Sequence, residues 1–365
     1  MMEAVILAGG AGKRLKPLTE HRPKPLIPVA GKPCIDYVIK SLVSADFKKI
    51  IITTGYLSDK VIKSIADGGQ FGAHILYSFE EVPVGTAGAV KRAEGFITGT
   101  FIVASGDVLA DVNIKELLDF HRKSGALATM ALTEVEDPTP FGIVGMDADG
   151  KINKFLEKPK KEEAFSNLIN AGIYILEPQV LEYIPANTLF DFAKNVFPIL
   201  LEKNLPIYGK IIKGIWRDIG RPHDLLRASL DVIERSGVPI SIPGVKTSGP
   251  IILGKNTVIE KGVRIVGPAY IGDDAFLSRG CVIERSCIYS KVFVDKGTVV
   301  RDSIVLDGSH ISWQSEVDNS VVSQGCNIEE DVRIMRSVIG DNMSVKIHSR
   351  IEDANISPPN GDTQK

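Results

Sequence analysis

The last third of this sequence carries aliphatic residues at every sixth position. The spacing is strict from Leu253 to Ile283, and after single-residue slips in phase it resumes and continues to Ile351. The predicted core positions are Leu253, Ile259, Ile265, Ile271, Leu277, Ile283, Ile288, Val294, Val300, Leu306, Ile311, Val317, Val322, Ile328, Ile334, Ile339, Val345 and Ile351. A period of six fits neither an amphipathic helix nor an alternating strand. It fits a solenoid in which each hexad forms one short strand and one corner, with three hexads in a triangular coil.

This periodic segment resembles the hexapeptide-repeat left-handed β-helix family, in which core-facing aliphatic residues adjoin small residues, as in IGDDAF (271–276). The resemblance implies a left-handed parallel β-helix, which we assign to residues 251–355. The preceding stretch, 237–250, is rich in Gly, Pro and Ser, so we expect a linker there. The polar residues 356–365 are expected to form a disordered tail.

The region from residue 1 to 236 alternates β-branched runs with amphipathic segments of helical length. The runs are Glu3–Ala8, Lys49–Thr54, His74–Phe79 and Phe101–Ser105. Such alternation predicts an α/β domain with a mostly parallel sheet.

The alternation is interrupted once. Asp149-Gly150 is a hairpin turn signal between two strand-like segments, so we expect an antiparallel excursion that makes the sheet mixed. A helix is predicted from Pro222 to about Ser236, where the domain ends.

Composition narrows the functional classes. The 365 residues include 43 Lys+Arg and 45 Asp+Glu, with no run of one sign, so no extended surface for nucleic acid or an anionic membrane is expected. No apolar stretch reaches the roughly 18 to 20 residues of a membrane span, and no secretory signal is evident, so we expect a cytoplasmic protein. Cys34, Cys281, Cys287 and Cys326 lack metal-site spacing and are expected to be reduced.

A glycine-rich loop leaves the first predicted strand. Its glycines let backbone amides approach a phosphate closely. The dinucleotide fingerprint is excluded because Leu15 stands where its third Gly is required, and the P-loop is excluded because Arg14 follows Gly12-Lys13. Lys13, Arg14 and Lys24 supply the cations that a triphosphate needs during transfer.

The segment LAGGAGKRLKPLTEHRPKPLIPVAGKP (7–33) resembles the signature of sugar-1-phosphate nucleotidylyltransferases, which join a nucleoside triphosphate to a sugar phosphate and release pyrophosphate. The resemblance extends to about Leu230 and implies that 1–236 is a Rossmann-like catalytic domain. Further matching segments, in order, are VPVGTAGAV (82–90), SGD (105–107), FGIV (141–144), FLEKP (155–159), NAGIYIL (170–176) and WRDIG (216–220).

The resemblance also implies roles for individual residues. Asp107 and Asp218 would hold Mg²⁺, Arg14 would contact the triphosphate with help from Lys13, and Lys24 would neutralise the reacting phosphates. Nucleotide contacts are expected at Leu7, Gly9, Gly10, Gly12, Lys13, Glu80, Pro83, Gly85 and Thr86. Contacts to the sugar phosphate are expected at Gly142, Glu157, Lys158 and Asn170.

Glu80 bears on the choice of nucleobase. Family members that use uracil or thymine commonly carry Gln at this position, whereas a carboxylate only accepts hydrogen bonds and suits the adjacent N–H donors of guanine. EEVPVGTAGAV (80–90) is also similar to mannose-1-phosphate guanylyltransferases. We therefore expect GTP and mannose 1-phosphate as substrates.

Other interpretations stay open at this point. They are a thymidylyl- or uridylyltransferase acting on glucose 1-phosphate, a non-catalytic regulatory relative, and a bifunctional enzyme whose β-helix transfers acyl groups with His310 or His348. The flat faces of a β-helix also favour a homo-oligomer.

Overall fold

The computed structural model describes residues 2–357, which form two compact units. Among these residues, the first unit comprises 2–11 and Cys34–Arg217, and the second comprises Gly12–Pro33 and 218–357. Each unit therefore contains two segments, whereas the ranges expected from the sequence are contiguous. The expected tail lies outside the described residues from 358 onward.

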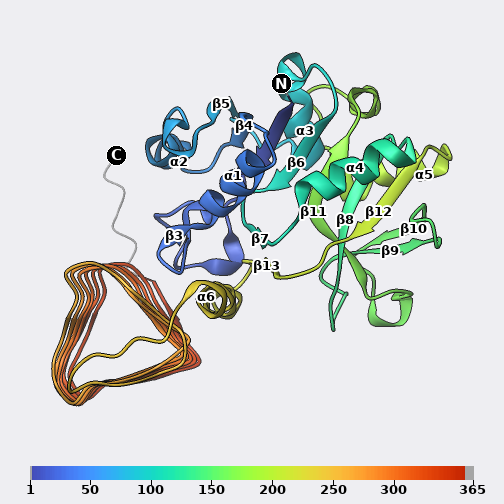
Figure 1. The fold of residues 1–365 in the computed structure, drawn as a ribbon. Helices are drawn as coiled ribbons and strands as arrows, with labels where there is room; N and C mark the ends of the chain where they lie inside the picture. Colours follow the sequence, from blue (N-terminus) through green and yellow to red (C-terminus); the bar gives the residue numbers. More distant parts are fainter. Residues whose placement is uncertain (1, 358–365) are drawn as a thin grey trace. The chain divides into compact units, whose positions relative to one another are not determined.

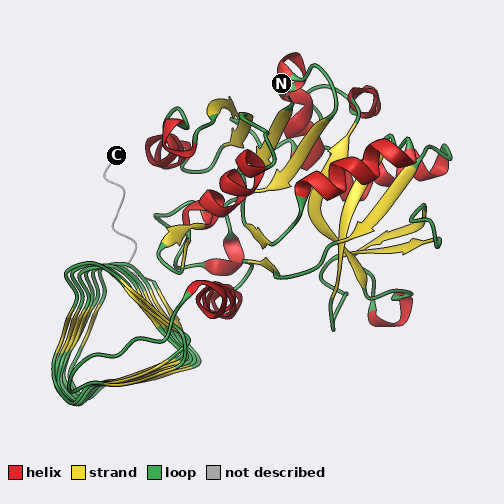
Figure 2. Ribbon diagram, in the orientation of Figure 1, coloured by secondary structure: helices red, strands yellow, loops and turns green. Residues whose placement is uncertain are grey.

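The first unit is built on a nine-stranded mixed sheet (Figures 1 and 2). Its main path runs β10-β9-β11-β6-β1-β4-β5, with β8 paired to β11 and β12. The strands are β1 (Glu3–Leu7), β4 (Lys49–Thr54), β5 (His74–Phe79), β6 (Phe101–Ser105), β8 (Ala128–Glu134), β9 (Gly142–Met146), β10 (Ile152–Glu157), β11 (Leu168–Leu176) and β12 (Ile207–Ile211). The four predicted runs become the parallel strands β1, β4, β5 and β6. β1, β4 and β6 are almost fully buried, which explains their continuous aliphatic character. β5 is the last strand of the path and is only partly buried, with Leu76 37% and Phe79 54% exposed.

The expected antiparallel excursion is the β9–β10 hairpin. Its strands pair antiparallel, and the turn between them contains Gly150 with φ of +88°, a conformation that favours glycine. The sheet also becomes antiparallel where β11 pairs with β6 and β8. The mixed, mostly parallel sheet predicted from the sequence is thereby confirmed.

Helices flank this sheet, as the amphipathic segments predict (Figure 2). They are α1 (Cys34–Ser44), α2 (Ser58–Ile65), α3 (Gly85–Arg92), α4 (Ile114–Ser124) and α5 (Phe197–Glu202). Asn113 caps α4, because its Oδ1 accepts the Glu116 backbone N–H at 3.2 Å. Among residues 2–357, no helix combines the length and apolar character that a membrane crossing requires.

The second unit contains helix α6 (Pro222–Ser236), at the predicted position, and a solenoid of three parallel sheets (Figure 1). The first sheet comprises β14 (Lys246–Ser248), β17 (Arg264–Val266), β20 (Val282–Glu284), β23 (Val299–Arg301), β26 (Glu316–Asp318), β29 (Arg333–Met335) and β32 (Arg350–Glu352). The second comprises β15 (Ile251–Leu253), β18 (Ala269–Ile271), β21 (Cys287–Ile288), β24 (Ile304–Val305), β27 (Val321–Val322), β30 (Val338–Ile339) and β33 (Asn355–Ile356). The third comprises β16 (Val258–Ile259), β19 (Phe276–Leu277), β22 (Phe293–Val294), β25 (His310–Ile311), β28 (Asn327–Ile328) and β31 (Ser344–Val345). The predicted left-handed parallel β-helix is confirmed, and β14 begins it inside the stretch expected to be a linker.

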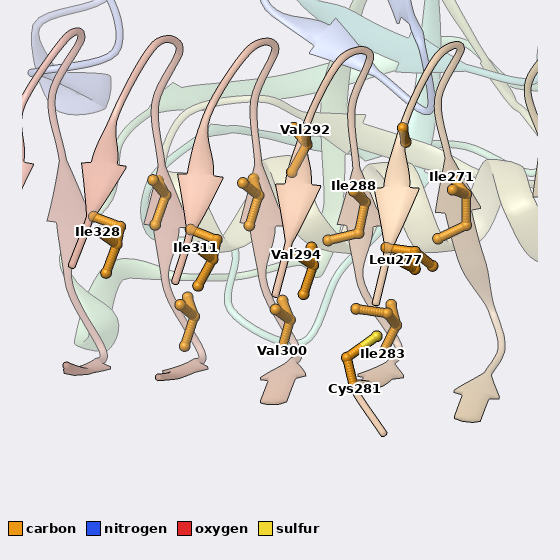
Figure 3. Close-up of a cluster of buried hydrophobic side chains, with 14 of the residues drawn as sticks. Ile271, Leu277, Cys281, Ile283, Ile288, Val292, Val294, Val300, Ile311 and Ile328 are labelled. Carbon is orange, nitrogen blue, oxygen red and sulfur yellow. The ribbon is translucent and has the colours of Figure 1, made fainter. Parts of the chain in front are cut away.

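Aliphatic side chains from successive coils stack inside the solenoid (Figure 3). Ile271 pairs with Ile288, and Val305 pairs with Val322, so these coils repeat every 17 residues. Two predicted core positions were wrong. Leu253, in the first coil, is 41% exposed. The other position was wrong by one residue. Val305, and not Leu306, occupies the core row, because the coil shortens between Val300 and Val305 rather than after Leu306.

Candidate active site

The parallel strands of the first unit end along one edge of the sheet, and the predicted nucleotide contacts follow them. Gly9 and Gly10 follow β1, Glu80 follows β5, and Asp107 lies two residues beyond β6. Strand order reverses between β1 and β6, because β4 continues the sheet on one side and β11 on the other. Open α/β sheets bind ligands outside the carboxyl ends of their strands at such a switch point.

Glu80 lies against the glycine-rich loop. A Cβ atom on Gly9 would stand 3.1 Å from Glu80 Oε1, and the Val84 backbone N–H donates to Glu80 Oε2 at 3.4 Å. Burial raises the pKa of Glu80, while the Val84 bond, Arg92 and the Thr53 hydroxyl act in the opposite direction. The Thr53 hydroxyl is itself buried and makes no hydrogen bond of ordinary geometry within residues 2–357. The half-buried Glu80 carboxylate, a hydrogen-bond acceptor, therefore lies beside Gly9, where the loop has no side chain.

The turn at Gly85 is fixed by a loop that sequence reasoning missed. Asp191 Oδ1 accepts both the backbone N–H and the hydroxyl of Thr86, at 3.1 and 3.2 Å. The Phe190 carbonyl accepts the N–H of Ala87 at 2.9 Å, and a Cβ on Gly85 would stand 2.5 Å from the same oxygen. The polar groups of Thr86 are thus used to build the turn, and Gly85 is required by close packing.

Asp107 is oriented by its own strand end. The Ser105 hydroxyl donates to Asp107 Oδ1 at 2.7 Å, and the Gly106 N–H donates to the Leu7 carbonyl at 2.9 Å. The second bond ties the SGD turn to the end of β1. Leu7, a predicted nucleotide contact, and Asp107, a predicted metal ligand, therefore lie close together at the ends of β1 and β6.

The predicted sugar-phosphate contacts gather around β9 and β10. Gly142 pairs with Glu157, and a Cβ on Gly142 would stand 2.8 Å from Glu157 Oε2, so glycine leaves room for the carboxylate. Burial raises the pKa of Glu157, with Lys158 and Lys194 opposing it and Asp191 adding to it. Lys158 Nζ lies 3.7 Å from Glu157 Oε1 and is exposed.

Asn170 has a local structural role in the same region. Its Oδ1 accepts the Gly172 N–H at 2.9 Å, and its Nδ2 donates to the Tyr174 hydroxyl at 2.8 Å. These bonds span a register shift in β11, where Gly172 has φ of +75°. The side chain stabilises this irregular bend within β11.

The predicted catalytic cations lie in the second unit together with Asp218. Lys24 Nζ is 3.3 Å from Asp218 Oδ1, and Arg14 Nη2 is 3.6 Å from Asp218 Oδ2. The Lys24 side chain is 11% exposed and that of Arg14 is 59% exposed. Lys24 is therefore held in place, whereas more than half of the Arg14 side chain is open to solvent.

Gly12 and Lys13 begin the segment that carries these cations. Gly12 has φ of +60°, and its carbonyl accepts the Thr19 hydroxyl at 2.9 Å. A Cβ on Gly12 would stand 2.9 Å from the Thr19 methyl, so the tight turn excludes a side chain. Lys13 and Pro83, in contrast, are exposed.

Asp107 and Asp218 each offer the type of ligand that a magnesium ion prefers. Within residues 2–357, no three His, Cys, Asp or Glu side chains are grouped as metal ligands. Mg²⁺ does not require such a group, because it is usually held by one or two carboxylates, water and substrate phosphates. Asp107 and Asp218 are oxygen donors of this kind, and the donor set does not suit a tetrahedral zinc site.

Two family models match this chain. The nucleotidyl transferase family model matches residues 3–235, and a model described as the GMPPB C-terminal domain matches residues 265–361. The chain belongs to the nucleotidyl transferase family. The family resemblance expected from the sequence is thereby confirmed, including its C-terminal β-helix.

Individual relatives differ in their named substrates. This nucleotidyl transferase is 35% identical to a UTP–glucose-1-phosphate uridylyltransferase of Synechocystis, over 79% of this chain and 83% of the relative. It is also 35% identical to a mannose-1-phosphate guanylyltransferase of Mycobacterium tuberculosis, over 78% and 83%. The solved structure of HddC from Yersinia pseudotuberculosis in complex with GMP-PN has a TM-score of 0.54 and 29% identity, covering 63% of this chain and 98% of that one.

Proposed function

We propose that this protein transfers the guanylyl group of GTP to mannose 1-phosphate, giving GDP-mannose and pyrophosphate. Family membership supports nucleotidyl transfer to a sugar 1-phosphate, because the Synechocystis and mycobacterial relatives are named as uridylyl- and guanylyltransferases of sugar 1-phosphates. The observation that carries the choice of GTP is the half-buried Glu80 carboxylate beside Gly9.

The reaction requires alignment and charge neutralisation more than proton transfer. The phosphate oxygen of the sugar phosphate attacks the α-phosphorus in line, the bond to the β-phosphate oxygen breaks, and pyrophosphate leaves. This nucleophile is already ionised, so no general base is needed. Lys24 neutralises the reacting phosphates, and Arg14, assisted by Lys13, stabilises the negative charge of the leaving group.

Asp107 and Asp218 would supply the protein carboxylates for Mg²⁺. A bound Mg²⁺ would add Lewis-acid stabilisation of the phosphate charges. The chain itself keeps Asp218 between Lys24 and Arg14, and keeps Asp107 oriented through Ser105.

The sugar phosphate would be recognised by residues of β9, β10 and β11. Lys158 is an exposed cation suited to the phosphate, and Glu157 is a half-buried carboxylate suited to a sugar hydroxyl. The Gly142 backbone leaves space beside Glu157. Asn170, which stabilises the bend in β11, would add a polar contact at the same edge.

Glu80 would select guanine by accepting from its two adjacent N–H donors. A carboxylate cannot donate to the carbonyl oxygens of uracil or thymine, so those bases lose a hydrogen bond at the same place. The Val84 N–H holds Oε2 of Glu80, and Gly9 lies beside Oε1. Both contacts limit how far the side chain can turn.

Exchange of one carboxylate for an amide tests this assignment. We expect Glu80→Gln to lower kcat/KM for GTP about tenfold relative to UTP and dTTP, because one charge-assisted hydrogen bond is lost. The matched control is Glu81→Gln, at an exposed neighbouring position. Pyrophosphate release measured with each nucleotide gives the ratio, and an unchanged ratio in Glu80→Gln would refute the role of Glu80.

A uridylyltransferase acting on glucose 1-phosphate is the second candidate. It is favoured by the similarity to the Synechocystis relative, which equals the similarity to the mycobacterial guanylyltransferase. Higher kcat/KM for UTP with glucose 1-phosphate in the wild-type protein would select it.

The remaining expectations from the sequence stay predictions. His348 Nδ1 lies 2.9 Å from Asp331, and the His310 ring packs edge-on against Phe293, so both histidines have contacts within the solenoid. Release of CoA from acetyl-CoA would be needed to support acyl transfer. The expected homo-oligomer is tested by the molar mass in solution.

A further inference from the structure

The segment 12–33, which carries Arg14 and Lys24, is part of the same compact unit as the solenoid. Hydrogen bonds attach it there at several points. The Tyr289 hydroxyl donates to the Pro28 carbonyl at 2.8 Å, and Arg22 Nη2 donates to Gln324 Oε1 at 2.5 Å. The Ala30 N–H donates to Ser229 of α6 at 3.3 Å. Lys24 therefore lies between two anchors, Arg22 and Pro28, that both bind the solenoid.

Tyr289 departs from the repeat. The residues that follow the core row of its sheet are Gly254, Gly272, Tyr289, Leu306, Ser323 and Gly340, as their equivalent backbone hydrogen bonds establish. Four of these are Gly or Ser, which suits a corner, whereas Tyr289 and Leu306 are large and only 2% and 0% exposed. The large side chain at Tyr289 is explained by the segment 12–33, whose Pro28 carbonyl accepts from its hydroxyl, and not by the coil itself.

Neighbouring contacts fix the position of the Tyr289 ring. Its centroid lies 5.2 Å from that of Tyr270, and the Tyr270 hydroxyl occupies the space that a Cβ on Gly31 would need. Gly31 has φ of +87°, so the chain turns sharply against Tyr270. The two tyrosines thus hold the segment from Pro28 to Gly31 against the second sheet of the solenoid.

Gln324 provides the other anchor. It lies at a corner of the solenoid and accepts from Arg22, two residues before Lys24. Nη1 of Arg22 is buried and makes no hydrogen bond within residues 2–357. The bond to Gln324 is therefore the polar contact that determines how this guanidinium is oriented.

We propose that Tyr289 and Gln324 are positioning residues for catalysis. They hold the segment 12–33 so that Lys24 stays at Asp218, and the solenoid in this way sets the geometry of the reacting charges. The inference rests on the proposed function, which gives Lys24 and Asp218 their roles. Small displacements of a charge-neutralising group lower the rate of transfer steeply, because its stabilisation of the transition state depends on geometry.

The first test separates positioning from stability. Tyr289→Phe and Gln324→Ala should each lower kcat about tenfold and leave KM for the sugar phosphate within about twofold. Gln324→Glu should retain most of kcat, because its carboxylate still accepts from Arg22. Ser315→Ala and Gln314→Ala are the matched controls. They remove a buried hydroxyl and a corner amide elsewhere in the solenoid, and should leave kcat unchanged.

A double variant tests whether Tyr289 acts through Lys24. In a Lys24→Ala background, Tyr289→Phe should change kcat less than twofold, because the group that it positions is gone. A full additional tenfold loss, or an unchanged kcat in Tyr289→Phe alone, would overturn the proposal.

Amide hydrogen exchange supplies a measurement that does not depend on turnover. Tyr289→Phe should raise exchange in residues 12–33 at least threefold, and Ser315→Ala should not. Unchanged exchange in Tyr289→Phe would overturn the anchoring role, whatever the activity. If the wild-type protein releases no pyrophosphate from any substrate pair, the proposed function fails, and the exchange experiment still decides whether Tyr289 anchors the segment.

Discussion

In the solenoid, successive coils place the same kind of residue at the same position, whereas each strand of the nine-stranded sheet ends in a different way. The core row contains Ile271, Ile288, Val305 and Val322. The ends of β1, β5 and β6 are followed instead by a glycine-rich loop, by Glu80 and by the SGD turn. Repetition provides stability coil by coil, while a site needs several different groups at one place.

The same comparison shows where the solenoid contacts another segment of the chain, in addition to forming its own core. Tyr289 and Leu306 break the small-residue pattern of their row, and the segment with the catalytic cations is bonded to Tyr289. A departure from the repeat is thus the signal of a specific contact. The nine-stranded sheet has no repeat, so the role of each strand end must be inferred from the residues around it.

The sharpest test of this division removes one carboxylate at a strand end. Asp107→Ala should lower kcat about a hundredfold or more, because a charge-stabilising interaction with the phosphates is lost. The unfolding midpoint should change little, since Asp107 is only partly buried. Asp119→Ala, at an exposed position of α4, is the control for loss of a carboxylate. Turnover near the wild-type rate in Asp107→Ala would remove Asp107 from the site.

The second test truncates an aliphatic residue in the core of the solenoid, where stability and not activity should change. Ile311→Ala should reduce the free energy of unfolding by about 2–5 kcal/mol, because Ile311 is completely buried in a central coil. The fraction that remains folded should keep the wild-type kcat. Ile347→Ala, at a side chain that is 48% exposed, is the control and should cost under about 1 kcal/mol. A loss of kcat in fully folded Ile311→Ala would break the division between stability and chemistry.

The smallest effect concerns a buried polar group in the first unit. Burial lowers the pKa of His121, although Glu177 opposes the shift and Arg122 adds to it. Its Nδ1 lies 2.8 Å from Thr129 Oγ1, and its Nε2 lies 3.0 Å from Glu177 Oε1. Because the unfolded chain binds the proton more readily, stability should fall as the pH drops below about 6.5.

A pair of histidine variants measures that dependence. Tm recorded between about pH 7.5 and pH 5.5 should fall less steeply in His121→Asn than in the wild type. His74→Asn, at an exposed histidine, should keep the wild-type slope. Equal slopes for all three proteins would mean that His121 does not contribute to acid sensitivity.

The elements themselves were largely predictable. The six-residue period predicted the solenoid because each coil repeats the same burial pattern, and the alternation of aliphatic runs with amphipathic segments predicted the sheet. The error at Leu306 has a simple cause. Both Val305 and Leu306 are aliphatic and fully buried, so only the strand pairing distinguishes the core residue from the one that packs outside it.

Contacts between distant segments were not predictable. Nothing near Thr86 in the sequence indicates that Asp191 accepts its N–H, and nothing near Lys24 indicates that Gln324 anchors the neighbouring Arg22. The large residue at Tyr289, in a row made mostly of Gly and Ser, was the one available signal that a distant segment binds the solenoid near this coil. Its meaning depends on the register of the coils, which the structure supplies.

The most direct measurement of the central claim is pyrophosphate release by the wild-type protein with Mg²⁺, over a matrix of nucleoside triphosphates and sugar 1-phosphates. The matrix should contain GTP, UTP, dTTP and ATP, each with mannose 1-phosphate and glucose 1-phosphate. The account predicts the highest kcat/KM for GTP with mannose 1-phosphate, by about tenfold or more over UTP or dTTP with glucose 1-phosphate. A higher kcat/KM for UTP or dTTP with glucose 1-phosphate would contradict it.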